Sequence, residues 1–517
     1  MASRKEQYSF MVTRFKGFWR QYRRSKRGML GIGIIAFFGV IAIFAPLISP
    51  IDPLSPKMEG HYPGQQPKMA EKLCYPIWYK TLLGMNDLSE NMLLVEDHEF
   101  NLDGIFDAQF KSQATPQGNI VVQQISTGGE HGDDDGYVAI TYVREEGEAP
   151  PEGNKITVAL QLEFEYPYQG APVSLWWHYS LHLEARTPME VNSPVNLTIR
   201  YRRGIESDTI HIRHARFSNL YIGGVWYSTA GTTVEVTDLL GVIFTKAGNY
   251  TAEFIFEIAD PGESADYTLR VDNLQVIQYG RAFGVLGTSS IPKGSPRDLF
   301  TMLLHGTRVS FMIGLLTAIF SVLIGLFVGL VAGYIRGLVD EGLMRFADFL
   351  LVLPGLPLLI VLVMVLGRSI WNIIGVLIFM GWMGFARTVR SMVLSLRERP
   401  FIESAKASGG GSGYIIYRHI LPNVFALVYI SLATSVPGAI IAEASLAWLG
   451  LGDINIPSWG IMLYDFSQTQ TAIVKGIGEY WFWVIPPGVA IALMAMAFIL
   501  MGFSLDEILN PKLRKRR

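Results

Sequence analysis

The chain has 517 residues, of which 50% are hydrophobic and 17% are charged. Its mean hydropathy of +0.28 argues against a purely water-soluble protein. The formal net charge of −2 conceals two regions of opposite charge, because residues 51–298 hold 33 acidic and 18 basic residues whereas the rest of the chain is basic. The single cysteine, Cys74, excludes an intramolecular disulfide.

The N-terminal segment, residues 1–27, carries nine Lys or Arg and one Glu, and residues 28–51 carry no charge. We interpret 28–51 as a first transmembrane helix, because the apolar stretch is too long for a signal peptide and prolines follow it in place of a cleavage site. The basic residues before it predict a cytoplasmic N-terminus. The aromatic and basic pattern of residues 15–27 also fits an amphipathic helix that lies on the inner membrane surface.

The acidic region, residues 52–291, contains no long apolar run, but apolar and polar residues alternate in several short segments. Such alternation, bounded by Gly, Pro, Asn and Asp, is typical of half-buried strands. We therefore expect a mainly β domain, a sandwich or jelly roll, as an extracellular insert between the first two transmembrane helices. Its VDNLQV stretch, residues 271–276, resembles jelly-roll domains of the carbohydrate-binding type.

Two functions are open for side chains of this insert. Its aromatic residues could stack on a sugar or pack in the core of the sheet. Three consecutive aspartates, Asp133, Asp134 and Asp135, fit either calcium ligands or a solvated turn. The aromatic residues concerned are Trp176, Trp177, Tyr179, Trp226 and Tyr227.

The remaining part, residues 292–517, holds five further uncharged runs, each about long enough to cross a hydrocarbon core of roughly 30 Å. With the first helix they predict a multi-pass α-helical membrane protein with six transmembrane helices. Both termini and the basic loop 387–422 then lie in the cytoplasm, in agreement with the positive-inside rule. Glycines at close spacing, Gly325, Gly329 and Gly333, predict tight helix packing. The five runs are residues 309–335, 349–367, 369–386, 420–442 and 480–505.

Prolines fall inside two of these predicted helices. Pro354 and Pro357 are expected to interrupt the third and Pro437 the fifth. Broken helices at membrane depth are tolerated where they line a cavity, so the three prolines are candidates for lining a pathway, with simple kinks as the alternative. Glu443, beside an apolar run, is a fourth candidate, and we expect it to face the bundle interior or the outer mouth, because a carboxylate in lipid is costly.

A polar loop between two apolar runs, residues 399–423, reads RPFIESAKASGGGSGYIIYRHILPN. Pro400 suits a first helical position and Glu403 a first turn, so a short helix is predicted over residues 401–408, with the glycines from Gly409 onward ending it. The row formed by Phe401, Ala405 and Ser408 is small and partly apolar, as suits a helix that lies in a groove on another protein. An ordinary cytoplasmic loop is the alternative.

These residues resemble the EAA motif of ABC-importer permease subunits. The chain also resembles the dipeptide/oligopeptide/nickel branch of that family, and within that branch its C-type subunits. The segments that carry this resemblance are 294–310, 442–452, 456–465, 481–488 and 503–514. The resemblance covers residues 10–53 and 284–514 and implies the fold of a type I ABC-importer permease. The chain departs from the family pattern at Ser404, where alanine is usual, in its run of three glycines, and in its large insert.

The resemblance implies that the loop forms a coupling helix that docks into an ATPase subunit. The residues expected to take part are Phe401, Ile402, Glu403, Ser404, Ala405, Lys406, Gly409, His419 and Pro422. It also implies the other partners: a second homologous permease subunit, two ATPase subunits that hold ATP and magnesium, an extracellular substrate-binding protein, and membrane lipid. No nucleic acid is expected.

The chain itself is predicted not to be an enzyme. Its sequence has no GxxxxGK followed by Ser or Thr, and no His or Cys cluster suggests a metal, so we expect no catalytic residue, metal or cofactor on it. Three functions remain open: import of oligopeptides across the plasma membrane, import of cello- or xylo-oligosaccharides by the same machinery, and a membrane-anchored surface receptor. The insert is expected to dock the binding protein or to pack on the partner permease.

Overall fold

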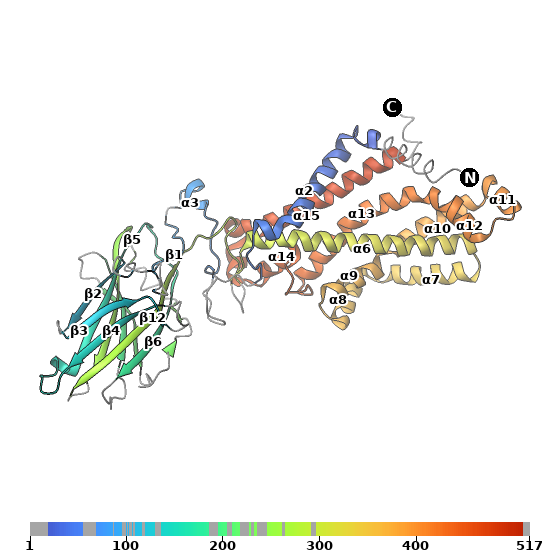
Figure 1. Cartoon of the computed structure of the whole chain (residues 1–517). Helices are drawn as coiled ribbons and strands as arrows, with labels where there is room; N and C mark the ends of the chain where they lie inside the picture. The colour runs from blue at the N-terminus through green and yellow to red at the C-terminus, as the bar shows by residue number, and fades with distance from the viewer. Residues whose placement is uncertain are drawn as a thin grey trace, which may run out of the picture. The chain divides into compact units, whose positions relative to one another are not determined.

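The chain forms a helical unit, made of Met1–Pro56 and Ser289–Arg517, and a β unit, Lys57–Thr288. The computed structural model describes residues 19–54, 69–85, 87–95, 100, 102, 106, 109–115, 119–129, 136–185, 195–203, 209–217, 227–228, 232–234, 244, 246–260, 264–290 and 296–509. The three aspartates 133–135, Trp226, the side chain of Tyr227 and the basic C-terminal residues 512–517 lie outside that description. Element labels follow Figure 1.

The β unit is built from two antiparallel sheets (Figure 1). Among the described residues, one sheet runs in the order β10, β6, β12, β4, β3, with β1 beside β12 and β9 beside β6, and the other runs β2, β5, β11, β7, β8. The unit also holds α3 (Tyr79–Leu82) and η1 (Glu152–Asn154). The strands are β1 (Met92–Leu93), β2 (Phe110–Thr115), β3 (Ile120–Ile125), β4 (Tyr137–Arg144), β5 (Lys155–Tyr166), β6 (Ser174–Ala185), β7 (Val195–Arg203), β8 (Thr209–Phe217), β9 (Tyr227–Ser228), β10 (Thr232–Val234), β11 (Gly248–Ala259) and β12 (Ala265–Tyr279).

A single hydrophobic core joins the two sheets. Successive side chains of a strand point to opposite faces, so the apolar positions of the alternating segments all reach the space between the sheets. Phe254 of β11 lies opposite Leu160 of β5 and Ile199 of β7, and all three are buried. Side chains of β4, β6 and β12 from the other sheet complete the same cluster. The prediction of a mainly β region is confirmed, and the region has a core of its own.

The aromatic residues of β6 pack inside the unit. Trp177 and Tyr179 are almost fully buried and belong to the core between the sheets. Trp176 is 4% exposed and packs with Ile277 and Tyr279 of β12. Stacking of these three β6 side chains on a sugar is therefore excluded in this structure, and the packing alternative is confirmed for them.

A buried ion pair links the end of β4 to the residue that follows β11. Arg144 donates from Nε and Nη2 to the two carboxylate oxygens of Asp260, at 3.0 and 2.8 Å, and the exposed fractions of the two side chains are 2% and 0%. The Tyr142 hydroxyl donates a third hydrogen bond to Asp260 at 2.9 Å. Because a buried charge is tolerated when it is paired and hydrogen-bonded, this cluster holds together the strands that supply its members.

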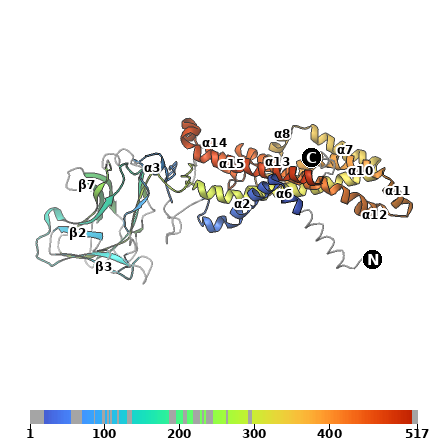
Figure 2. The ribbon, with the colours of Figure 1, turned by 90° about the horizontal axis from the view of Figure 1, so that it is seen from above.

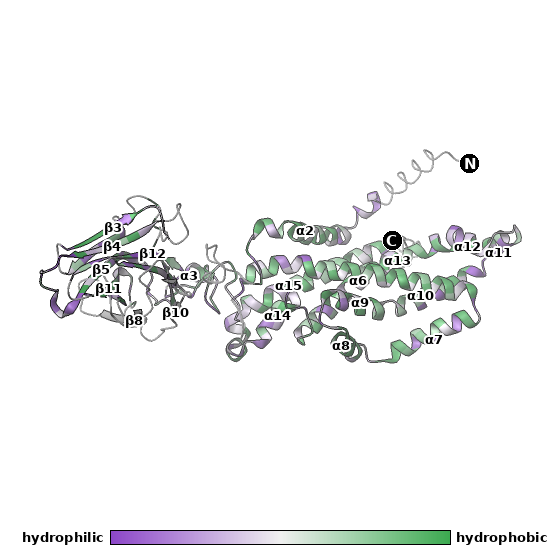
Figure 3. Ribbon diagram, turned by 60° about the horizontal axis from the view of Figure 1, so that its bottom comes forward, coloured by the Kyte–Doolittle hydropathy of each residue, from purple (hydrophilic) through white to green (hydrophobic). Residues whose placement is uncertain are grey.

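The helical unit contains, within its described residues, five helices long and apolar enough to cross a membrane, and a sixth crossing if a bent helix pair counts as one. Apolar residues run along the long helices (Figure 3). This agrees with a multi-pass membrane protein. The helices are α2 (Lys26–Ile48), α6 (Leu299–Ile335), α7 (Leu338–Val352), α8 (Gly355–Leu366), α9 (Ile370–Gly381), α10 (Met383–Arg397), α11 (Pro400–Ala407), α12 (Ser412–Ile415), η2 (Ile416–Ile420), α13 (Leu421–Trp448), α14 (Trp459–Gln468) and α15 (Gln470–Leu509).

The third predicted transmembrane helix is broken. α7 and α8 meet at an angle of 95°, and Pro354, in an extended conformation, precedes the first residue of α8. The predicted interruption is thus confirmed at Pro354, whereas Pro357 lies inside α8. α7 begins at Leu338, eleven residues before the predicted run. The prediction began too late because it took only uncharged residues, whereas the first turn of α7 carries Asp340 and Glu341.

The predicted break at Pro437 is wrong, because α13 continues through it. Proline lacks the N–H that would bond to the carbonyl one turn earlier, which weakens a helix. Here the helix is supported from outside: Val436 and Ile440 are buried against Gly314 of α6, and a Cβ added at Gly314 would lie 2.7 Å from Ile440 Cγ1. Packing against α6 therefore offsets the lost hydrogen bond.

The glycines of α6 allow a close approach to α10. A Cβ added at Gly329 would lie 2.6 Å from the carbonyl oxygen of Ala386, which is shorter than any ordinary contact. Gly325 and Gly333 face α10 at similar distances. The predicted tight packing is confirmed for α6 and α10.

Candidate functional site

The loop between α10 and α13 contains a short helix at one end of the bundle. In two views α11 and α12 lie at the end opposite α14 (Figures 1 and 2). α11 spans Pro400–Ala407, one residue earlier at each end than predicted, with Pro400 in its first turn and Glu403 near the positive end of the helix dipole.

Gly409 ends this helix as predicted. Its φ of +80° lies in the left-handed region, and its N–H bonds back to the Lys406 carbonyl at 2.9 Å. The N–H of Gly410 bonds to the Ala405 carbonyl at 3.0 Å. The two bonds satisfy carbonyls that the helix end would otherwise leave without a partner.

α11 has a buried side and an exposed side. Ile402 is fully buried and packs with Ile415, Ile420 and Val424, so it anchors the helix to the bundle. Its contact with a partner subunit stays a prediction. Ala405 packs partly against the same cluster. The exposed side chains are those of Pro400, Phe401, Glu403, Ser404, Lys406, Ala407 and, just after the helix, Ser408.

An aromatic patch lies beside the exposed side of α11. The His419 ring lies 6.4 Å from the Phe401 ring and 5.7 Å from the Tyr414 ring, measured between centroids. Tyr414 and Tyr417 are 58% and 74% exposed, and the predicted residue Pro422 is exposed nearby. The prediction did not include the two tyrosines, although two aromatic residues three apart in a polar loop are a signal for a contact surface.

The end of α6 supports α11 from the other side. Arg397 of α10 donates to the Tyr334 carbonyl at 2.8 Å, and its guanidinium lies 5.7 Å from the Tyr334 ring. The ammonium of Lys406 lies 5.9 Å from the same ring. Cations over one aromatic face are attracted to it, so the loop has a defined position relative to the α6 and α10 pair.

Two ion pairs connect α10 to the bent helix pair. Arg390 binds Asp340 of α7 with two hydrogen bonds, of 2.5 and 2.7 Å. Arg387 pairs with Asp348, which lies eight residues after Asp340 on the same helix. Asp340 is 9% exposed. A bidentate arginine restrains direction as well as distance. The two pairs therefore restrain α7 against α10.

At the opposite end of the bundle, Glu443 of α13 is 3% exposed, so it lies inside the bundle as expected. Ser458 donates to Glu443 Oε1 at 2.7 Å and also accepts from the Ile461 N–H at 3.1 Å, which makes it the N-cap of α14. This contact joins α13 to α14. Pro354 and Pro357 are exposed and Pro437 is buried, and the assignment of these prolines and Glu443 to a pathway stays a prediction.

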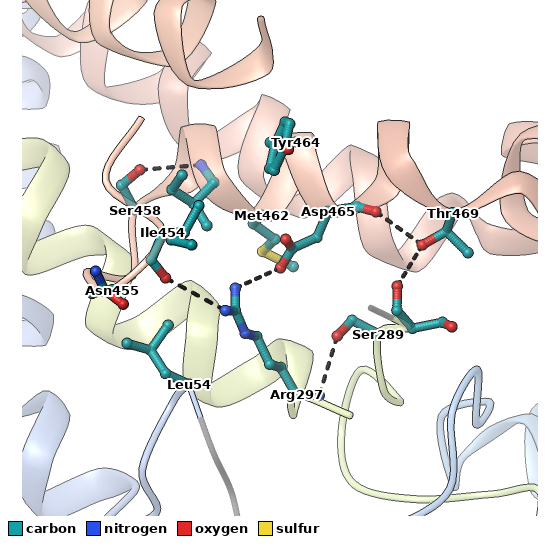
Figure 4. Close-up of polar contacts among 12 residues, drawn as sticks. Leu54, Ser289, Arg297, Ile454, Asn455, Ser458, Met462, Tyr464, Asp465 and Thr469 are labelled. Atoms are coloured by element: carbon teal, nitrogen blue, oxygen red, sulfur yellow. Dashed lines mark hydrogen bonds and ion pairs between the residues drawn. The ribbon is translucent and has the colours of Figure 1, made fainter. Parts of the chain in front are cut away.

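A set of polar contacts ties the segment before α6 to α14 (Figure 4). Arg297 donates to Asp465 at 2.8 Å and to the Ile454 carbonyl at 3.4 Å. The Arg297 N–H donates to Ser289 Oγ at 3.1 Å, and Thr469 Oγ1 donates to the Ser290 carbonyl at 2.5 Å. We call these four contacts the Arg297 clasp. The prediction missed it, because its members are far apart in the sequence.

The clasp predicts a pH-dependent effect of Arg297→Ala. Burial raises the pKa of Asp465 to about 6, and Arg297 acts against that rise. Without the guanidinium the folded-state pKa rises further above the unfolded value, so the unfolded chain loses its proton first as pH rises. The variant should lose about 3 kcal/mol of stability in this region at pH 8, and much less at pH 5, where the buried carboxyl is neutral. Hydrogen exchange of the α14 amides at both pH values measures the loss.

The control is the double variant Arg297→Ala with Asp465→Asn, which has no titrating carboxyl at this place. Measured against the single variant Asp465→Asn, the stability that this double variant loses should be equal at pH 5 and pH 8. An equal loss for Arg297→Ala alone at the two pH values would show that Asp465 does not carry a buried charge against Arg297.

Two family models match the chain. The binding-protein-dependent transport system inner membrane component model matches residues 325–515, and the model of the N-terminal TM domain of oligopeptide transport permease C matches residues 13–67. The second match extends over the first eleven residues of the β unit, 57–67, and the first match begins within α6. The rest of the β unit, residues 68–288, lies outside both matches.

Curated relatives match over the helical part. The dipeptide transport system permease protein DppC of Bacillus subtilis is 37% identical over 221 residues, which are 42% of this chain and 67% of the relative. The oligopeptide transport system permease protein OppC of Bacillus subtilis is 34% identical over 42% of this chain and 70% of its own length. The glutathione transport system permease protein GsiD of Pectobacterium atrosepticum is 34% identical, with the same coverage.

Among solved structures, a family 11 carbohydrate-binding module from Clostridium thermocellum is similar over 37% of this chain and 96% of its own length, with 10% identity and a TM-score of 0.18. A similarity of this size says nothing about a ligand.

Proposed function

The chain belongs to the family of binding-protein-dependent transport system inner membrane components, and on that basis we propose that it is a permease subunit of an ATP-driven importer of oligopeptides. The peptide cargo is supported by the relatives named for dipeptides, oligopeptides and glutathione. The observation that carries the proposal is α11, a short exposed helix held by one buried side chain at the end of a transmembrane bundle.

In the proposed mechanism α11 docks into a groove on a separate ATPase subunit. Phe401, Glu403 and Lys406 form the exposed contact side, and Ile402 holds the helix on the bundle. When two ATPases close on ATP and magnesium, the force on α11 passes to α10. The Arg390 and Asp340 pair then moves α7, and the 95° bend between α7 and α8 changes the pathway that this chain forms with a second permease subunit.

The proposed orientation places α11 in the cytoplasm. The start of α2 and the end of α15 lie at the same end of the bundle as α11 (Figure 1). Basic residues gather in that part of the chain, as the positive-inside rule expects for a cytoplasmic side. The β unit then lies outside the cell, where it docks a substrate-binding protein or packs on the partner permease.

Transport by the reconstituted complex tests the proposal. The chain is co-purified with its partner permease and ATPases and placed in proteoliposomes with the binding protein. We expect ATP-dependent accumulation of a labelled oligopeptide, and none when the ATPase carries an inactivating change in its phosphate loop. Accumulation of cello- or xylo-oligosaccharides in place of the peptide would overturn the cargo. Failure of any ATPase to co-purify would favour the surface-receptor function.

A further inference from the structure

A groove with basic walls lies between the N-terminal segment and the end of α15. Its volume is about 530 Å³. It lies where α2 begins and α15 ends, at the same end of the bundle as α11 (Figure 1). The lining residues are Gln21, Arg24, Ser25, Lys26, Arg27, Glu507 and Ile508. The transport function proposed above does not use this groove.

The walls of the groove are held in place by contacts beneath them. Ser25 accepts from the Gly28 N–H at 3.2 Å as the N-cap of α2, and its hydroxyl lies 2.9 Å from that of Ser504 on α15. A Cβ added at Gly28 would lie 2.8 Å from the Tyr22 ring and 2.9 Å from Ser504, so α2 and α15 are in close contact here. The basic residues thus project from a fixed backbone.

The charge of the groove is not balanced by the described part of the chain. Arg24, Lys26 and Arg27 are exposed, and none of them forms an ion pair with a described residue. The lining holds three cations and one carboxylate, that of Glu507. Three closely spaced cations repel one another, and an anion with several acceptor oxygens would remove that repulsion and form charge-assisted hydrogen bonds.

The surface next to the groove is apolar. Along α2, exposed hydrophobic side chains continue away from the basic residues, among them Leu30 at 56% and Phe37 at 60%. Trp19 is 39% exposed and stacks on Tyr22 at 6.1 Å, a position typical of aromatic residues at a membrane interface. A molecule that fits both parts has an anionic head and long apolar chains.

We propose that this groove binds an anionic phospholipid, with its phosphate among Arg24, Lys26 and Arg27 and its acyl chains along α2. Basic pockets beside transmembrane helices on the cytoplasmic side are a known place for such head groups. The site would fix the N-terminal segment at the inner membrane surface. This inference rests on the proposed orientation, which puts the start of α2 in the cytoplasmic leaflet.

Native mass spectrometry of the detergent-purified transport complex tests the site. The probes are phosphatidylglycerol, phosphatidylcholine and inorganic phosphate. We expect retention of phosphatidylglycerol over phosphatidylcholine, and a loss of about fivefold for each charge removed in Arg24→Gln, Lys26→Gln and Arg27→Gln. The charge-preserving pair Arg24→Lys and Arg27→Lys should retain the lipid. The matched control, Arg20→Gln with Arg23→Gln, removes two charges of the same segment that do not line the groove, and should also retain it.

Three results would overturn the site. Equal retention by the wild type and the groove variants shows that the groove does not hold the lipid, and equal loss in the control variant shows only diffuse attraction. Displacement of the lipid by inorganic phosphate at equal concentration shows a free-anion site. The same spectra report whether the ATPase subunits are bound, so loss of lipid from an intact complex is distinct from failure of the proposed transport function.

Discussion

Valine in place of Gly409 is expected to abolish ATP-driven uptake while the chain still inserts and assembles. Gly409 has a φ of +80°, so valine at this position would have to adopt the left-handed backbone conformation. That conformation costs a residue with a Cβ roughly 1–2 kcal/mol of conformational free energy. The turn would escape the strain by changing conformation and would lose the bonds from Gly409 and Gly410 to the Lys406 and Ala405 carbonyls. The direction of α11 then changes, and uptake should fall by about tenfold or more.

The matched control for this variant is Gly411→Val. Gly411 has φ of −69° and ψ of 157°, an extended conformation that valine adopts readily, and a Cβ there meets nothing within 4 Å. Uptake by the Gly411→Val variant should stay within about twofold of the wild type, because valine prefers an extended conformation.

A second variant, Glu403→Lys, tests the contacts of α11 without changing the direction of the helix. Glu403→Lys leaves the turn intact and reverses one exposed charge in the first turn, which costs the helix only about 0.3–1 kcal/mol. The uptake of this variant should also be lost, because the proposed mechanism places the exposed side of α11 against the ATPase. Normal uptake by both Gly409→Val and Glu403→Lys, with normal amounts of complex in the membrane, would remove the coupling role of this loop.

Replacing Arg144 by leucine is expected to have the largest effect on stability in the β unit. The change leaves the Asp260 carboxylate buried and without its cation, because the two side chains are 2% and 0% exposed. Breaking a buried ion pair by removing one partner typically costs about 3–5 kcal/mol. The free energy of unfolding should fall by that amount, measured by hydrogen exchange of the β4 and β12 amides in the purified full chain.

An exposed ion pair of the same unit is the control. Lys111 and Glu163 lie 2.7 Å apart, but their side chains are 68% and 57% exposed, and such pairs are worth about 1 kcal/mol or less. Lys111→Leu should therefore change the stability little. Replacing Arg144 and Asp260 together by leucine should recover part of the loss, since no buried charge remains. If Arg144→Leu cost no more than Lys111→Leu, the buried pair would not be holding the strands together.

Much of the candidate site was predictable from local sequence. Pro400, Glu403 and Gly409 mark the start, first turn and end of α11 by their individual conformational preferences, so the helix was placed within one residue. The face of the helix was less predictable. Local sequence did not show that Ile402 is buried. It is buried because α12, η2 and the start of α13 return over α11 and supply Ile415, Ile420 and Val424.

The sequence by itself determined the kind of elements and the family of this protein. Alternating residues specify strands because one face of a sheet is buried, and long uncharged runs specify membrane helices because the hydrocarbon core has a fixed thickness. The tertiary structure alone decided how distant residues meet. Arg297 and Asp465 are 168 positions apart, and Arg144 and Asp260 are 116 apart. Neighbouring helices also decided whether a proline breaks its helix. Pro437 does not break α13, because α6 packs against that part of the helix. No local pattern encodes these outcomes, because each depends on a surface that a different part of the chain supplies.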